Sequence, residues 1–200
     1  MNVELKEVFG LSKDFGKKYF RDILEISCKY KIREIDLTNS DDKNIISFIG
    51  KAMNNFINTS TSSETRYKGN RPNEVGKNME IGIIEEMKKT PLKPTKLGSS
   101  GYPDLYIEYD SQKVYVELKT SAQKKKADTH HRLFYFTSGK KITCDAHHLL
   151  LQIQINEEAS KYWQVVSWQL RDLYNLQVSL KTEWNANNAD FEAAGLLIEG

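Results

Sequence analysis

The sequence predicts a single α/β (α+β) domain in which a mixed central β-sheet is flanked by helices. Amphipathic helical patterns fill the first part of the chain, a polar hairpin-like stretch follows, and strand-like apolar runs come after it. This order is typical of domains in which helices cover a sheet. A chain of 200 residues with 39% hydrophobic content is long enough to bury one core without disulfides.

Apolar residues recur at helical spacing in three segments of the first half. Helices are expected over residues 13–31, over 40–57 and over 74–89. A Ser-Asp pair at 40–41 is suited to cap the second of these helices. The intervening residues 58–73 are polar and predict a flexible loop. Two prolines end the third helix, and a basic loop is expected at 93–96.

The second half of the chain predicts strands. A hairpin is expected within residues 103–119, further strands over 148–155 and 162–168, and a short helix over 170–176. The expected organisation is one domain with N-terminal helices (1–57), the flexible loop (58–73), a catalytic core (74–168) and a C-terminal extension (169–200).

Composition limits the kinds of partner and compartment. The chain has 29 basic and 27 acidic residues, so affinity for a polyanion must come from local basic patches. Cys28 and Cys144 lack metal-ligand spacing, which favours a reducing compartment. The N-terminus lacks a signal-peptide core, and no apolar run approaches membrane-spanning length. We therefore expect a cytoplasmic protein with no membrane partner.

The hairpin brings two carboxylates and an amine together. Opposed residues in a two-stranded hairpin have residue numbers of constant sum, so pairing Tyr109 with Gln112 sets Asp104 opposite Glu117. The strand period of two places Glu117 and Lys119 on one face. The turn is Asp-Ser, a weaker signal than Asn-Gly, so a register shifted by one residue remains open and would move Asp104 to the opposite face.

This arrangement suits metal-dependent phosphodiester hydrolysis. Opposed Cβ atoms lie about 4.5–5.5 Å apart, close enough for Asp104 and Glu117 to share a Mg²⁺ ion. The backbone carbonyl of Leu118 offers a further ligand, and Lys119 can orient or help deprotonate the attacking water. The alternative is a solvent-facing hairpin with a weak surface ion pair. Glu-x-Lys also occurs at 4–6 and 86–88, but neither copy follows a Pro-Asp on a paired strand.

Pro103-Asp104, twelve intervening residues and Glu117-Leu118-Lys119 resemble the signature of the PD-(D/E)xK nuclease superfamily, most of all its type II restriction endonucleases. The resemblance implies a restriction-endonuclease-like fold, Mg²⁺ as cofactor, and double-stranded DNA as substrate. It also implies a homodimer that cuts a short palindrome. In this superfamily an upstream helix often adds a glutamate, for which Glu80 is our first candidate and Glu74 the second. An exposed helix acid is the alternative for Glu80.

Two basic segments are candidates for DNA contact. The first follows the catalytic strand and is expected to meet phosphates; its members are Lys124, Lys125, Lys126, His130, His131, Arg132, Lys140 and Lys141. The second precedes the catalytic helix and can reach base edges; its members are Arg66, Lys68, Asn70 and Arg71. Each of these charges, taken singly, is equally well explained as a solvated loop residue.

The remaining histidines and tryptophans are expected to have structural roles. Adjacent residues of a strand face opposite sides, so His147 and His148 make a poor metal pair and are interpreted as structural or DNA-facing. Trp163 and Trp168 are expected to pack in the core or at a dimer surface.

The hypothesis is therefore a Mg²⁺-dependent, site-specific DNA endonuclease that uses metal-activated water. A repair, nicking or junction-resolving nuclease would use the same catalytic residues. A non-catalytic DNA-binding domain and a small α/β interaction domain remain as alternatives of other classes, and the acid-acid-lysine set argues against both.

Overall fold

A computed structural model describes residues 17–63, 65–98, 101–122, 136 and 138–178 of the chain. Tyr19–Leu176 form one compact unit, which contains the predicted catalytic residues. A second unit comprises Met1–Lys18 and Gln177–Gly200. Strand β1 (Lys18–Tyr19) pairs with β9 (Gln177–Val178) in a separate two-stranded sheet.

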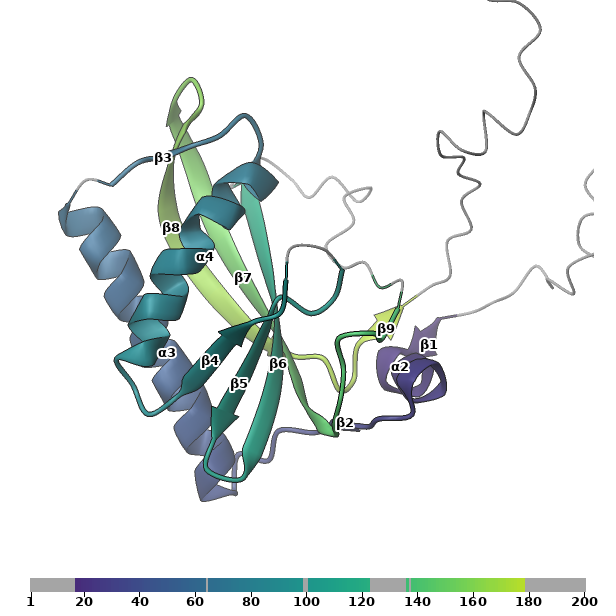
Figure 1. Cartoon of the computed structure of the whole chain (residues 1–200). Helices are drawn as coiled ribbons and strands as arrows, with labels where there is room; N and C mark the ends of the chain where they lie inside the picture. The colour runs from purple at the N-terminus through teal and green to yellow at the C-terminus, as the bar shows by residue number, and fades with distance from the viewer. Residues whose placement is uncertain (1–16, 64, 99–100, 123–135, 137, 179–200) are drawn as a thin grey trace, which may run out of the picture. The chain divides into compact units, whose positions relative to one another are not determined.

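Within the described residues of Tyr19–Leu176, a seven-stranded mixed sheet forms the centre of the fold (Figure 1). The strands β6–β7 and β2–β7 run parallel, and the other neighbours are antiparallel. This sheet confirms the predicted fold class. The order is β3 (Tyr67–Lys68), β8 (Tyr162–Asp172), β7 (Ala146–Ala159), β6 (Gln112–Ala122), β5 (Leu105–Tyr109) and β4 (Lys93–Lys96), with β2 (Ile32–Arg33) beside β7.

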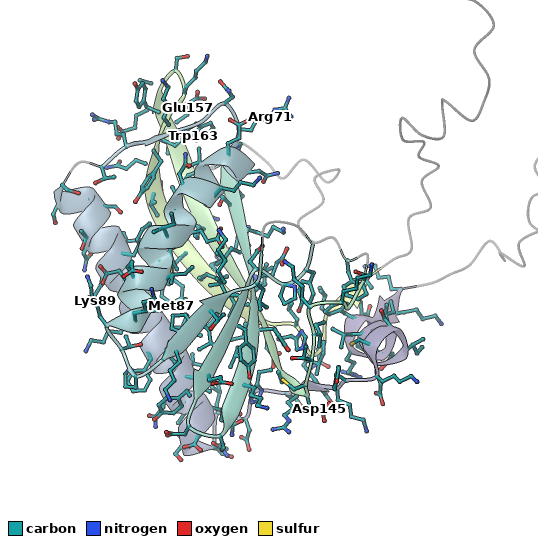
Figure 2. The ribbon with its side chains drawn as sticks, in the orientation of Figure 1. Arg71, Met87, Lys89, Asp145, Glu157 and Trp163 are labelled. Atoms are coloured by element: carbon teal, nitrogen blue, oxygen red, sulfur yellow. The ribbon has the colours of Figure 1, made fainter. Side chains whose placement is uncertain are left out.

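Helices α3 (Ser40–Ser62) and α4 (Pro72–Lys88) pack against each other and cover one face of the sheet (Figure 1). Helix α4 contacts β4 and β6, whereas α3 contacts β8. Most apolar residues of both helices are buried on this side, among them Met87, which Figure 2 labels beside the exposed Lys89, whereas Ile81 of α4 is exposed. A third helix, α2 (Phe20–Cys28), precedes β2. The helical pattern predicted from residue 13 onward lies outside the described residues as far as residue 16.

The hairpin of β5 and β6 has the predicted register. Its ladder pairs Leu105 with Val116 and Tyr109 with Gln112, so the alternative shifted by one residue is excluded. Asp104 lies directly beyond the last pair, and its backbone N–H donates to the carbonyl of Val116 over 3.1 Å. Asp104 therefore lies beside the segment of β6 that carries Glu117.

Three local predictions differ from the structure. The loop predicted at 58–73 is helical through Ser62, because the hydroxyl of Ser60 is buried and hydrogen-bonds the Tyr67 hydroxyl at 3.0 Å. Residues 93–96 form an edge strand, where a proline that lacks an N–H donor is tolerated. The short helix predicted over 170–176 is wrong, since β8 continues through Asp172 along the long strand β7.

Helix α4 approaches β6 closely at Gly76. A Cβ atom at this position would lie 2.3 Å from Oγ1 of Thr120. We expect Gly76→Ala to lower the free energy of unfolding by about 1–3 kcal/mol, because the overpacked helix must move away from the strand. Urea denaturation of both proteins measures the difference.

Gly50 in α3 provides the matched control. A Cβ there would meet the ring of Trp168 at 3.5 Å, an ordinary contact. Alanine in a helix interior stabilises by up to about 1 kcal/mol relative to glycine. If Gly76→Ala were as stable as Gly50→Ala, the close approach of α4 to β6 would be contradicted.

Candidate active site

A cavity of about 260 Å³ lies where the N-terminal half of α4, the turn before β5 and the middle of β6 meet. The predicted residues Asp104, Glu117, Lys119 and Glu80 all line it. Helix α4 contributes Asn73, Gly76, Lys77 and Glu80, the turn contributes Gly101, Tyr102 and Asp104, and β6 contributes Glu117, Leu118, Lys119 and Thr120.

Glu117 is the most deeply buried acid of the cavity, with 3% of its surface exposed. Its Oε1 atom lies 2.5 Å from Nζ of Lys119, while the buried Oε2 atom has no hydrogen-bond partner within the described part of the chain. Burial and the charge of Asp104 raise the pKa of Glu117 to about 7, and Lys119 opposes this rise. A buried carboxylate oxygen without a partner is unfavourable unless another group binds it.

Asp104 is held beside Glu117 by the backbone of β6. Its Oδ2 atom accepts a hydrogen bond from the N–H of Leu118 at 2.7 Å. Burial raises the pKa of Asp104, the Leu118 hydrogen bond and Lys119 lower it, and the charge of Glu80 adds to the rise. The buried carboxylate of Glu117 and the half-buried carboxylate of Asp104 thus repel each other in the lining of the cavity.

The donor set of this pair fits a hard divalent cation. Both groups present oxygen, and the unpartnered Oε2 atom of Glu117 is available as a ligand. Among the described residues, no group of three or more His, Cys, Asp or Glu side chains is arranged to hold a metal ion. Mg²⁺ suits a site with two carboxylates, because it keeps several of its waters when bound to protein.

The raised pKa of Glu117 predicts a pH dependence of stability. Its carboxyl binds a proton more tightly in the folded chain (pKa about 7) than at the ordinary value of 4.5, so the folded state is favoured at low pH. The free energy of unfolding should fall by roughly 2–3 kcal/mol as pH rises through this window. Urea denaturation in EDTA at several pH values measures it. Glu117→Gln should flatten this part of the profile, and an identical slope in the variant would contradict the assignment.

The two helix glutamates have different surroundings. Glu80 is 8% exposed, lines the cavity and forms an ion pair with Nζ of Lys96 at 2.8 Å. Glu74 is exposed, and its Oε2 atom accepts the backbone N–H of Asn70 at 2.8 Å beside the start of α4. Position therefore favours Glu80 over Glu74 as the third acid of the cavity.

The candidate DNA-contact residues that the structure describes lie outside the cavity lining. Arg66, Lys68, Asn70 and Arg71 are exposed along the segment that enters and leaves the edge strand β3, next to β8 and before α4 (Figure 2, where Arg71 is labelled). Nε of Arg66 forms an ion pair with Glu158 at 2.6 Å. Lys140 is exposed. The remaining candidates lie outside the described residues, namely Lys124, Lys125, Lys126, His130, His131 and Arg132.

The two histidines face opposite sides of β7, as predicted. His147 lies 3.4 Å from Asp42 of α3, whereas Nδ1 of His148 hydrogen-bonds the hydroxyl of Tyr102 at 2.6 Å. Burial lowers the pKa of His148 to about 3, so this side chain is neutral. Trp163 is 5% exposed and packs in the core, as expected.

Several residues of the site escaped sequence reasoning. Lys96 pairs with Glu80 from β4, a strand that a Lys-Pro-Thr-Lys segment did not suggest. Lys141, which remains a candidate for phosphate contact, donates from its Nζ atom to the carbonyls of Gly101 and Pro103. Nothing in the spacing of the sequence signalled that contact, because it joins segments 40 residues apart.

The sequence as a whole is similar to known type II restriction enzymes. A family model for the type II restriction enzyme MjaV family matches residues 15–193. A relative described as type II restriction enzyme MjaV, from Methanocaldococcus jannaschii, is 32% identical over 201 residues, which cover 90% of this chain and 86% of that protein. The predicted resemblance to type II restriction endonucleases is thereby confirmed. The chain belongs to the type II restriction enzyme MjaV family.

Proposed function

We propose that this chain is a Mg²⁺-dependent endonuclease that hydrolyses both strands of double-stranded DNA at a specific sequence. Family membership identifies it as a type II restriction enzyme, a site-specific deoxyribonuclease. The observation that supports the metal-dependent mechanism is the cavity itself, where Glu117 presents a buried oxygen that has no hydrogen-bond partner among the described residues, beside Asp104 and Lys119. The proposed cofactor is Mg²⁺, held by Asp104, Glu117 and the carbonyl of Leu118.

Each residue of the cavity has a proposed task in direct attack of water on the phosphodiester. Asp104 and Glu117 hold the cation, which when bound supplies positive charge against the phosphate and lowers the pKa of water. Lys119 orients the attacking water and stabilises developing negative charge, because its ammonium lies at the carboxylate of Glu117. Glu80, which forms an ion pair with Lys96, adds a third acidic group to the lining of the cavity.

DNA binding is proposed for the basic residues outside the cavity. Arg66, Lys68, Asn70 and Arg71 offer base-edge or phosphate contacts from one end of the sheet, and Lys140 offers a phosphate contact. We extend the phosphate proposal to Lys124, Lys125, Lys126, His130, His131 and Arg132. A homodimer is proposed because one site per subunit can cut each strand of a palindrome. A cytoplasmic location is proposed because the proposed substrate is DNA. None of the described helices is long and apolar enough to span a membrane.

Incubation with plasmid DNA and Mg²⁺ tests the proposed function. A site-specific endonuclease yields discrete fragments, which EDTA should prevent. Nicked circles without fragments would indicate a nicking enzyme, and unchanged plasmid would indicate a DNA-binding protein without activity. Light scattering of the free protein distinguishes a dimer from a monomer.

A further inference from the structure

Lys141 fastens the turn that delivers Asp104 to the cavity. Its Nζ atom donates to the carbonyl of Gly101 at 2.7 Å and to that of Pro103 at 2.9 Å. These carbonyls flank Tyr102, and Pro103 directly precedes Asp104. A single ammonium therefore joins two points of the main chain within three residues of a proposed metal ligand.

The turn is also anchored through the buried side chain of Tyr102, whose hydroxyl hydrogen-bonds Nδ1 of His148 at 2.6 Å. Gly101 adopts a φ of 76°, the left-handed region that favours glycine. Beyond it, Asp104 is bound to β6 through its own N–H and through the N–H of Leu118. The bonds from Lys141 lie upstream of these contacts, so the turn is secured both before and at Asp104.

The charge of Lys141 also acts on the carboxylates. Electrostatic interactions link its ammonium to both Asp104 and Glu117, with attractive sign. Lys119 is engaged with Glu117, and Lys96 with Glu80. Lys141 thus offsets part of the repulsion between Asp104 and Glu117, and it is not among the residues that line the cavity.

We propose that Lys141 is a positioning residue of the metal site, which holds the Gly101–Pro103 main chain so that Asp104 and Glu117 face one cation. This inference rests on the proposed role of the two acids as metal ligands. Residues that orient metal ligands typically contribute about 10–100-fold to metal affinity. Loss of the Lys141 ammonium should therefore weaken metal binding by a factor of this size while the fold is retained.

Mn²⁺ binding to the full chain without DNA tests the proposal, with free Mn²⁺ measured by electron paramagnetic resonance. Lys141→Gln should raise the dissociation constant about 10–100-fold. Lys141→Arg, which keeps the charge and the donors, should remain close to the wild type. Lys113→Gln is the matched control. Lys113 is exposed near the start of β6 and does not line the cavity, so this change should leave Mn²⁺ affinity unchanged. Circular dichroism verifies the fold of each variant.

The outcomes separate this inference from the proposed function. If the wild type binds no Mn²⁺, or Asp104→Asn binds as well as the wild type, the metal site itself is misassigned. If Asp104→Asn loses binding but Lys141→Gln does not, the role of Lys141 alone is refuted. Loss of fold in Lys141→Gln beside a folded Lys113→Gln would show that Lys141 supports the domain and not the site, which also overturns the inference.

Discussion

Replacing Lys119 with alanine should reduce DNA cleavage by about 10²–10⁴-fold while DNA binding persists. Nζ of Lys119 lies 2.5 Å from Oε1 of Glu117 in a half-buried position, from which we propose that it orients the attacking water. The alanine variant keeps both carboxylates, so its cation and DNA still bind but the water loses its partner. Single-turnover cleavage at saturating Mg²⁺ measures the loss, and gel shift in EDTA measures binding.

Lys113→Ala is the control for charge. Lys113 lies on the same strand but is exposed and does not line the cavity, so cleavage by this variant should match the wild type. Undiminished cutting by Lys119→Ala would refute the catalytic assignment. An equal loss of DNA binding and cleavage would instead indicate that Lys119 only contacts the substrate.

The hairpin was predictable because its chemistry is local. Alternation along β6 and the constant sum of paired residue numbers fix which side chains face one another, and the structure reproduces the register from Leu105 to Tyr109. The same local reasoning placed Glu80 on a helix of the correct extent. It failed where the partner strand determines the outcome, as for β4 and the end of β8, because apolar pattern is weak in short edge segments.

The lysines of the site show a second limit of prediction from sequence. A lysine carries no directional signal in sequence, and Lys96 and Lys141 acquire their roles only from residues 16 and 38–40 positions away. Sequence reasoning therefore identified the candidate ligands but not the lysines that contact them or their turn. Acidic pairs need such cations because burial raises the pKa of both Asp104 and Glu117.

Asp104→Asn should abolish cleavage and at the same time stabilise the chain in EDTA. The change removes one of two anionic ligands, which should slow cleavage by about 10³-fold or more. It also removes the charge that raises the pKa of Glu117, and relief of this repulsion should increase the free energy of unfolding by about 1 kcal/mol. The amide oxygen of asparagine can still accept the N–H of Leu118.

The effect of Mg²⁺ on stability should also differ between the wild type and Asp104→Asn. A ligand that binds only the folded state raises the unfolding temperature, so wild type should gain stability with Mg²⁺ and Asp104→Asn should not. Asp110→Asn is the control, since Asp110 is an exposed turn residue of the same hairpin with a φ of 49°, which asparagine tolerates. A destabilised Asp104→Asn in EDTA would mean that the two carboxylates do not repel each other. If Asp104→Asn is more stable but cleaves DNA more slowly, the repulsion between Asp104 and Glu117 lowers the stability of a chain that needs both acids to bind the cation.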